Sequence, residues 1–277
     1  MSSQDSFGLF FKSTLDKADY LLRQGRGLRW LVDEQLANLK PKSPKRLIDF
    51  ACGTGTLTLA LAARYSKAEV VGIDLDAELL TAGQANAQEQ GVHNVIFQQA
   101  DVQEVPLPTA SFDAAVGQFF LQYPPEPQRA IHEMVRLVRP GGVVQVCEAD
   151  PDSVVLHPML SWRVIRSTLY DVIAAHGGQP YVVQALYDLF RDAALAEVDL
   201  RLIPWVSTAG NPQAIRNIAM HYLDAARKCY DVAVRFRSQQ RDALPALSRV
   251  TAELAAFGED PGAVYYAVYV VARGEKP

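Results

Sequence analysis

The chain has 277 residues, of which 49% are hydrophobic and 21% charged, and its formal net charge is −4 at pH 7. This length and composition are typical of a globular protein with one large domain, or one domain that carries a sizeable insertion. The mildly acidic balance gives no electrostatic reason to expect a nucleic-acid partner. The three cysteines are scattered and form neither a disulfide framework nor a metal-ligand cluster, so we expect a reduced, cytoplasmic protein.

The N-terminal residues show no signal-peptide pattern, and no stretch is apolar over the ~20 residues that a membrane span requires. We therefore expect no membrane span. Within the first 44 residues, Phe7–Leu39 carries apolar side chains at helical spacing, with a break predicted at Gly25 and Gly27. Residues 1–44 are predicted to form a helical lid, although their aromatic side chains would equally suit simple packing on the domain.

From residue 45 to residue 150, short apolar runs alternate with amphipathic segments. Continuous apolar strands separated by helices are typical of a parallel sheet that helices cover on both faces. In an open sheet of this kind, a ligand binds at the carboxyl ends of the strands. The predicted strands are Arg46–Phe50, Glu69–Ile73, Val95–Gln99, Phe112–Gly117 and Gly142–Glu148, and the predicted helices are Leu57–Tyr65, Ala77–Gln90 and Pro127–Val138.

The first strand leads through a glycine-bearing turn into a helix, in the stretch Leu47–Thr58. Gly53 and Gly55 allow a sharp turn and a close approach of the backbone to a ligand. An NAD site would need a third glycine where this chain has Thr58, and a phosphate-binding loop would need a lysine after Gly55. Asp49 would repel a pyrophosphate but attract a cationic amino acid group. The stretch therefore favours a nucleoside with a positively charged amino acid tail.

Two further carboxylates follow the second and third predicted strands. Asp74 is placed to accept hydrogen bonds from both hydroxyls of a ribose, whereas the alternative is that Asp74 or Asp76 caps the next helix. Asp101 is placed to accept a hydrogen bond from an adenine amino group, and its alternative is a solvated loop position.

Four stretches together resemble the class I S-adenosylmethionine-dependent methyltransferases, over about Arg46–Glu148. Asp49–Gly55 (DFACGTG) is similar to their glycine motif, and Val70–Asp76 (VVGIDLD) to their ribose-binding second strand. Gln99–Asp113 resembles their adenine-binding stretch, and His132–Gly142 the helix and turn before their fifth strand. The likeness is strongest to the subgroup that methylates small molecules, including quinone-biosynthesis C-methyltransferases. It implies an α/β, Rossmann-like fold with a seven-stranded, mostly parallel sheet, helices on both faces and an added helical cap.

The resemblance also implies the cofactor, S-adenosyl-L-methionine, and the residues that hold it. Asp49 and the glycine turn would hold the methionine part, Asp74 the ribose, and Leu75, Asp101 and Val102 the adenine. Ala51 stands where the family most often has its first glycine, a difference of one methyl group. The expected cofactor-binding residues are Tyr20, Asp49, Ala51, Gly53, Thr54, Gly55, Asp74, Leu75, Asp101, Val102 and Gln118.

The residues that follow the fourth predicted strand indicate which kind of molecule accepts the methyl group. Enzymes that methylate amino groups of nucleic-acid bases usually carry N/D-P-P-Y/F there, whereas this chain has Gly117–Leu121 (GQFFL). A nucleic-acid substrate is therefore not expected. Phe119, Phe120 and Tyr123 indicate a small apolar or aromatic acceptor, with core packing as the alternative for both phenylalanines. The expected substrate contacts are Phe119, Tyr123 and Tyr222.

Beyond the fifth strand, Glu148–Asp152 carries three carboxylates, which suit a turn and helix cap as well as a divalent metal, and we expect no metal. The remaining elements divide the chain into further parts. Residues 151–210 would complete the core, 211–260 would form a helical cap insertion, and 261–277 the final core strand and tail. The elements predicted there are helices over Val154–Gly177 and Pro180–Ala194, a strand over Glu197–Pro204, helices within Asn211–Glu259, and a strand over Ala263–Ala272.

The expected function is methyl transfer to oxygen or carbon of a small acceptor in a capped pocket, since in-line alignment and exclusion of water both favour such a displacement. An oxygen acceptor would need a base, for which His221 is the first candidate and His157 the second. No base would be needed for an acidic acceptor or a carbanion-like carbon. The alternatives are an S-adenosylmethionine-binding enzyme that catalyses a cyclisation, and a scaffold with an inactive cofactor pocket. The oligomeric state stays open between monomer and homodimer.

Overall fold

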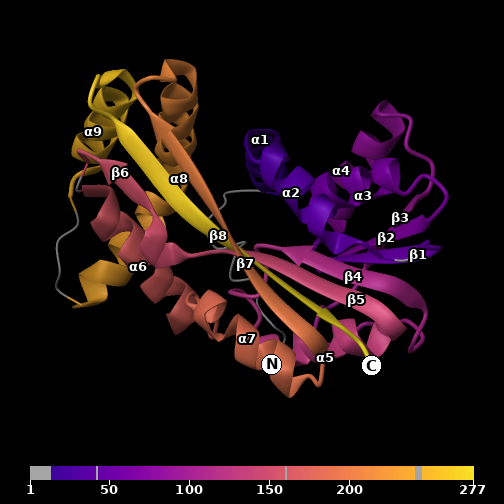
Figure 1. Cartoon of the computed structure of the whole chain (residues 1–277). Helices are drawn as coiled ribbons and strands as arrows, with labels where there is room; N and C mark the ends of the chain where they lie inside the picture. Colours follow the sequence, from indigo (N-terminus) through magenta and orange to yellow (C-terminus); the bar gives the residue numbers. More distant parts are fainter. Residues whose placement is uncertain (1–13, 42, 160, 241–244) are drawn as a thin grey trace.

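The computed structural model describes residues 14–41, 43–159, 161–240 and 245–277, so the first part of the predicted lid lies outside the described residues. A single sheet of eight strands forms its centre, in the order β3-β2-β1-β4-β5-β8-β6, with β7 paired to β8 (Figure 1). The predicted α/β, Rossmann-like fold with a mostly parallel sheet is confirmed. Five strands are mutually parallel, and the other three join them through β8 in antiparallel pairing.

The parallel strands lie close to their predicted positions, because β1, β2 and β4 are short, mostly apolar runs that are buried in the centre of the sheet. The edge strand β3 is only partly buried. Helices α2 and α3 cover one face of these strands, and α5 and α7 cover the other. The bounds are β1 Arg46–Phe50, β2 Glu69–Asp74, β3 Val95–Gln99, β4 Phe112–Gln118 and β5 Val138–Ala149, with α2 Arg29–Leu39, α3 Thr56–Arg64, α4 Ala77–Glu89, α5 Pro127–Leu137 and α7 Leu186–Asp192.

Strand β8 (Val264–Glu275) joins the core to the rest of the molecule. Along one edge it pairs first with β5 and then, farther out, with the short strand β6 (Val155–His157). Along the other edge, β7 (Ala196–Thr208) accompanies it from end to end. The sequence predicted seven strands, and the structure has an eighth, β6. This strand pairs with the same edge of β8 as β5 does, but farther from the core.

Two predicted helices begin later than expected. The helix predicted over Val154–Gly177 is wrong at its start, since β6 and a proline precede α6 (Ser161–Ala175), and backbone pairing with β8 holds this part extended. The helix predicted over Pro180–Ala194 opens as a 3₁₀ turn at Val182–Ala185 before α7.

A helical cap packs on the outer half of the β7–β8 ribbon. It consists of α6, α8 (Pro212–Gln240) and α9 (Leu247–Glu259), and Figure 1 shows the three helices gathered at the end of the ribbon that points away from the core. Their apolar faces share one buried cluster with inward-facing residues of β8, among them Tyr265 and Ala267. None of the helices in the described ranges is both long enough and apolar enough to cross a membrane.

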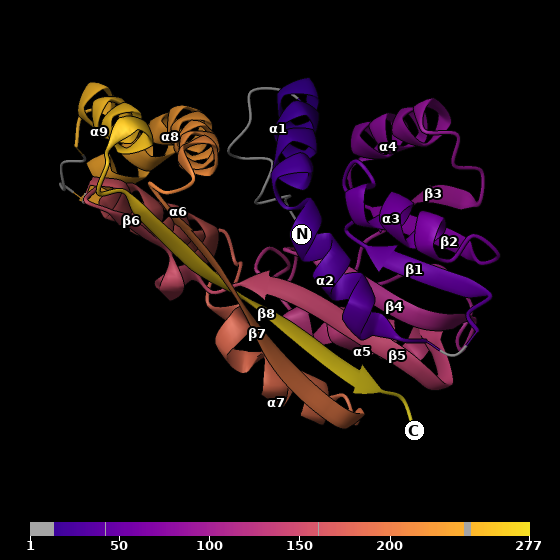
Figure 2. The same ribbon diagram turned by 45° about the horizontal axis from the view of Figure 1, so that its top comes forward.

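Helix α1 (Thr14–Gly27) lies between the core and the cap, next to α4 on one side and α8 on the other (Figure 2). Of the break predicted at Gly25 and Gly27, the part at Gly27 is confirmed, since α1 ends there and α2 begins at Arg29. The part at Gly25 is wrong, since the helix continues through it. A Cβ at Gly25 would lie 2.4 Å from the hydroxyl oxygen of Thr56, so glycine allows α1 to pack closely against the start of α3.

Ion pairs connect α1 to both neighbours. The ammonium of Lys17, which is almost fully buried, lies 3.2 Å from the carboxylate of Asp76 at the start of α4. On the other side, the guanidinium of Arg23 lies 2.8 Å from Asp224, and Asp16 pairs with Lys228, both partners being on α8. The lid is therefore attached to the core and to the cap.

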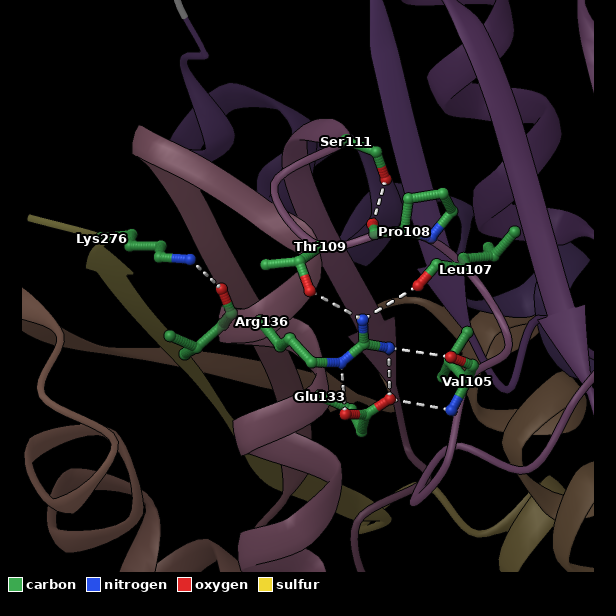
Figure 3. A network of polar contacts seen from close by, with 9 residues as sticks. Val105, Leu107, Pro108, Thr109, Ser111, Glu133, Arg136 and Lys276 are labelled. Atoms are coloured by element: carbon green, nitrogen blue, oxygen red, sulfur yellow. Dashed lines mark hydrogen bonds and ion pairs between the residues drawn. The ribbon is translucent and has the colours of Figure 1, made fainter.

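A polar network holds the loop between β3 and β4 (Figure 3). Arg136 on α5 donates hydrogen bonds to the carboxylate of Glu133 and to the carbonyl oxygens of Val105 and Leu107, at 2.8 and 2.9 Å for the two carbonyls. Glu133 also accepts from the Val105 N–H at 2.8 Å. Burial alone would raise the pKa of Glu133, but the bonds from Arg136 and Val105 lower it overall. This network supports the loop that begins at Asp101.

We expect Arg136→Met to lower the free energy of unfolding by about 1–3 kcal/mol, because two backbone carbonyls would lose their donor. Urea denaturation followed by circular dichroism measures the change. Arg129→Met is the matched control, since Arg129 is an exposed arginine on the same helix that pairs only with Glu126 among the interactions we describe. Equal effects of the two substitutions would contradict the role assigned to the network.

Candidate cofactor and acceptor site

One cavity of about 1000 Å³ lies between the strand ends of the core, the lid and the cap. Ligand pockets range over about 300–1,000 Å³, so this cavity has room for a nucleoside-sized ligand and a second molecule. All but one of the cofactor-binding residues predicted from the sequence line it. These are Tyr20, Asp49, Ala51, Gly53, Thr54, Asp74, Leu75, Asp101, Val102 and Gln118.

The glycine turn after β1 buries the carboxylate of Asp49. Its Oδ2 accepts a hydrogen bond from the hydroxyl of Thr58 at 2.6 Å, so the residue that replaces a third glycine satisfies this carboxylate. Gly53 and Gly55 have φ angles of +53° and +84°, in the left-handed region. Gly55 does not line the cavity. It is the N-cap residue of α3, where a Cβ would lie 2.8 Å from the ring of Phe97.

The buried position of Asp49 changes its titration. Burial raises the pKa of its carboxyl to about 7, the Thr58 hydrogen bond opposes this shift, and the nearby Asp74 adds to it. The group is therefore partly protonated near neutral pH. A cation bound beside it would favour the ionised form.

Asp74 closes the glycine turn from the neighbouring strand. Its carboxylate accepts hydrogen bonds from the N–H groups of Gly53 and Asp76, at 2.8 and 3.0 Å. Asp76, in turn, accepts from the N–H groups of Glu78 and Leu79 and caps α4. The cap is thus formed by Asp76, and Asp74 faces the cavity.

The ends of β2, β3 and β4 add an apolar surface and two further polar side chains to the cavity. Asp101 accepts a hydrogen bond from the Gln103 N–H at 2.9 Å and lines the cavity. Leu75 is 41% exposed although it is a large apolar residue, and it also lines the cavity. Gln118, at the end of β4, accepts a hydrogen bond from the side-chain amide of Gln35 on α2 at 3.1 Å.

Aromatic rings from the lid, the cap and the late strands form the opposite wall. Tyr20 of α1 stacks on His221 of α8 with ring centroids 5.6 Å apart, and His221 meets Tyr222 edge to face at 5.3 Å. The predicted substrate residues Phe119, Tyr123 and Tyr222 all line the cavity. Further aromatic lining residues, which the sequence analysis did not select, are Tyr170, Trp205, Tyr265 and Tyr269.

The sequence contains a strand-like alternation that could have pointed to two of these residues, Tyr265 and Tyr269. Tyr265, Ala267 and Tyr269 alternate along β8, so their side chains share one face, and all three line the cavity. What periodicity alone does not show is that this face is turned toward the cavity, because that depends on how the cap packs.

The two predicted bases lie in different surroundings. His221 lines the cavity, and burial, followed by the charge of Arg23, lowers its pKa to about 4, so its imidazole is neutral at pH 7. His157 ends β6, is exposed and does not line the cavity. The structure therefore brings only His221 to the candidate site.

Glu148 is turned into the protein rather than toward Asp150 and Asp152. It accepts hydrogen bonds from the N–H groups of Phe120 and Leu121 at 2.9 and 2.8 Å, and burial raises its pKa to about 7. Asp150 caps a 3₁₀ turn by accepting from the Asp152 N–H. Across the described ranges, no three histidine, cysteine or acidic side chains are grouped as metal ligands would be.

Comparison with known proteins identifies the part of the chain that contains the strand-end carboxylates. Residues 47–142 match the family described as "Methyltransferase domain". They form a class I S-adenosylmethionine-dependent methyltransferase domain. Demethylmenaquinone methyltransferase of Thermus thermophilus is 37% identical over 139 residues, which cover 49% of this chain and 61% of that protein. The chain spans 54–61% of the length of this and two other relatives of the same name.

Solved structures share the fold of the methyltransferase domain and part of its surroundings. The phosphoethanolamine N-methyltransferase 2 of Haemonchus contortus, in complex with S-adenosyl-L-methionine, has a TM-score of 0.58 at 15% identity, covering 89% of this chain and 52% of that one. The [4+2]-cyclase SpnF has a TM-score of 0.56 at 23% identity, covering 89% and 80%. At these identities the likeness concerns the fold alone.

The cavity of the methyltransferase domain fits the cofactor of this class. S-adenosylmethionine carries positive charge on its sulfonium and ammonium groups, and Asp49 offers a carboxylate with little competition from water. Asp74 and Asp101 supply acceptors for hydroxyl and amino groups, and Leu75 supplies an apolar surface for a flat base. These residues match the charge and shape of the cofactor, but which atoms they contact remains a prediction.

We expect Asp74→Asn to weaken binding of S-adenosylmethionine and S-adenosylhomocysteine about 10- to 100-fold, because hydrogen bonds to a charged acceptor contribute about 1.5–3 kcal/mol. Isothermal titration calorimetry measures both affinities. Asp150→Asn is the control, since Asp150 caps a turn outside the cavity and asparagine caps equally well. Unchanged affinity in Asp74→Asn, with a normal urea midpoint, would mean that the ribose lies elsewhere.

The raised pKa of Asp49 predicts a pH dependence. Its folded value of about 7 lies above the ordinary value of 3.8, so its contribution to stability falls as pH rises between them and is constant above about pH 7. A bound cation prefers the ionised carboxylate, so the affinity for S-adenosylmethionine should rise from about pH 6 to about pH 8. Asp49→Asn should remove this rise, as measured by calorimetry.

Glu148→Gln is the matched control for this experiment. The pKa of Glu148 is also raised to about 7 by burial, but Glu148 does not line the cavity. The Glu148→Gln substitution should alter how the free energy of unfolding depends on pH. It should leave the pH dependence of cofactor affinity unchanged. A rise in affinity that persists in Asp49→Asn would assign the pH dependence to another group.

Proposed function

We propose that the protein transfers a methyl group from S-adenosylmethionine to an oxygen or carbon atom of a small apolar or aromatic acceptor. One observation carries the proposal. A single cavity has the carboxylates of the methyltransferase domain on one wall and the aromatic rings of the lid and cap on the other. A cationic cofactor and an aromatic acceptor would each meet the wall that suits it, within the same cavity.

The proposed cofactor contacts follow the positions of the strand ends. Asp49 would hold the ammonium group and Asp74 the ribose hydroxyls. Asp101 would accept from the adenine amino group, with Leu75 and Val102 beside the ring. Gln118, whose side chain is oriented by its hydrogen bond with Gln35, would lie between cofactor and acceptor.

The bound cofactor supplies an electrophilic methyl group on a sulfonium sulfur. The aromatic wall would orient the acceptor toward this methyl group and keep water away, which favours an in-line displacement. His221 is neutral at pH 7 and is therefore able to accept a proton from a hydroxyl group of the acceptor. Tyr20, stacked on His221, would hold the imidazole in place.

The name of the Thermus thermophilus relative indicates a quinone-type acceptor for that protein. We propose an acceptor of the same broad class, a substituted aromatic ring or quinone, because rings line the acceptor side of the cavity. We also retain, as proposals, the division into lid, core and cap, a cytoplasmic location, the lack of a nucleic-acid substrate, and a monomer or homodimer.

A second candidate function is a non-methylating reaction such as cyclisation in natural-product biosynthesis. The observation in its favour is the size of the cavity, about 1000 Å³, which would enclose a large folded substrate. Methyl transfer remains the preferred function, because the curated relatives that match the core are named methyltransferases.

We expect transfer of labelled methyl from S-adenosylmethionine to hydroquinones or phenols, and none to DNA or RNA. His221→Gln should lower the rate for a phenol about 100-fold at neutral pH, because a general base typically contributes 10²- to 10⁴-fold. Its cofactor affinity should stay within about twofold. His93→Gln is the control, since His93 is an exposed histidine outside the cavity.

Two results would count against methyl transfer. Failure to bind both S-adenosylmethionine and S-adenosylhomocysteine would exclude either enzyme function. Tight binding of both, with no label transferred to any member of a panel of phenols, quinols and amines, would favour the cyclisation candidate.

A further inference from the structure

Strand β7 forms one edge of the sheet. It pairs with β8 along one side, and no strand of the described ranges pairs with its other side (Figure 2). With 13 residues, β7 is longer than most strands. An unpaired edge offers its backbone N–H and C=O groups to a strand of another molecule, so proteins usually cover, bend or interrupt such an edge.

The edge of β7 is interrupted on both sides of a short stretch. Before this stretch, the pairing with β8 shifts register between Ala196 and Asp199, and Glu197 has a φ angle of +49°. After it comes Pro204, which has no N–H to donate. The residues between these interruptions, Asp199–Ile203, form the regular part of the edge, which we call the edge window.

The pairing with β8 determines which backbone groups of the edge window face outward. The Ala209 N–H donates to the Ala263 carbonyl oxygen across the two strands, at 3.0 Å. In an antiparallel ladder alternate residues direct their hydrogen-bonding groups to the same side, so the odd-numbered residues of β7 face β8. Leu200 and Leu202 therefore direct their N–H and C=O groups away from the sheet, and Pro204 removes the next outward donor.

The side chains of the edge window are exposed on both faces of the strand. Leu200 and Leu202 share one face and are 40% and 66% exposed. Asp199 and Arg201 share the other face, are exposed, and make no ion pair or side-chain hydrogen bond within the part of the chain that the structure describes. Arg273 lies opposite Asp199 on β8 but pairs with a glutamate on its own strand. The window thus has one apolar face and two opposite charges without partners.

Two copies of this window are complementary when they run antiparallel about a two-fold axis at Leu200. Leu200 of one copy then lies opposite Leu200 of the second, and the two exchange a pair of backbone hydrogen bonds. Asp199 of each copy lies opposite Arg201 of the other, so opposite charges meet at two symmetric positions. Leu202 lies opposite Val198 of the second copy, which covers apolar surface on the other face.

Other registers centred in the window are less favourable. A two-fold axis at Arg201 would place the two arginines opposite each other. An axis at Leu202 would place Leu200 opposite Pro204, which loses a hydrogen bond, and would leave Asp199 and Arg201 opposite uncharged residues. The charges therefore select the axis at Leu200.

We propose that two copies of this chain form a homodimer by antiparallel pairing of their β7 edges, with the two-fold axis at Leu200 and ion pairs between Asp199 and Arg201 across it. The occupant of the edge is a second copy, because the order Asp–Leu–Arg is complementary to itself when it is reversed. The inference does not depend on the proposed methyl transfer, since none of these residues lines the cavity.

The test uses charge reversal on the full chain. Sedimentation equilibrium from about 1 µM to about 1 mM should show a dimer for wild-type protein. Arg201→Asp and Asp199→Arg should each raise the dimer dissociation constant at least about tenfold, because like charges then meet at both positions. An equimolar mixture of the two variants should dimerise again, because every Asp then faces an Arg. Misfolding of either variant would not give this recovery.

Arg163→Asp is the matched control for charge reversal. Arg163 is an exposed arginine on α6 whose side chain has no partner within the described ranges, so its substitution should leave the dissociation constant unchanged.

Cysteine cross-linking with diamide tests the register. Leu200→Cys should give a disulfide-linked dimer on a non-reducing gel, because opposite residues of a hydrogen-bonded pair have Cα atoms about 5.5 Å apart. Leu202→Cys should not, because its two copies would lie roughly 14 Å apart in this register. Cross-linking at position 202 alone would overturn the proposed register.

Three results would overturn the proposed dimer. Wild-type protein that is monomeric throughout the concentration series would leave the edge to a strand of another protein. A dimer that both charge reversals leave intact but Val206→Asp abolishes would place the interface on the outer apolar face of the ribbon, where Val206 is exposed. A mixture of Arg201→Asp and Asp199→Arg that stays monomeric would exclude the paired charges.

Discussion

The burial of the Asp49 carboxylate beneath the glycine turn is the constraint around which the cofactor half of the structure is arranged. Removing a carboxylate from water costs several kcal/mol unless hydrogen bonds or a cation compensate. Thr58 supplies one hydrogen bond from the first turn of α3, which ties the helix to the strand end. Asp74 then holds the turn itself through the Gly53 N–H. Much of the remaining compensation would come from a cationic ligand, so the site is prepared for positive charge before the ligand arrives.

The sequence was sufficient to predict the core because its signals are local. β1 and β3 have the bounds that their apolar runs predicted, and Asp49 and Asp74 were located by the rule that parallel strands expose their carboxyl ends at one edge. The start of α6 was mispredicted because an apolar stretch after Val154 suits a helix as well as a strand. Only pairing with β8, which is distant in sequence, makes this stretch extended.

The acceptor side was harder to predict for the same reason. Tyr265, Ala267 and Tyr269 show the alternation of a strand, but whether their shared face meets solvent, core or cavity depends on α8 and on the lid. The sequence ranked His221 ahead of His157 as a base, but only packing placed His221 in the cavity wall and His157 at the surface. The family match ends at residue 142, and most of the aromatic residues that line the cavity, among them Trp205, Tyr222 and Tyr265, lie outside it.

The continuous β7–β8 ribbon limits how the cap can move relative to the core. A cap joined to a core by a flexible linker can swing as a rigid body, but here two long hydrogen-bonded strands pass from one into the other without interruption. Bending them would break the ladder along its length. The helix α1 has no such backbone connection to its neighbours and is attached to both by side-chain ion pairs. We therefore infer that ligand entry and exit would require movement of α1 rather than of the cap.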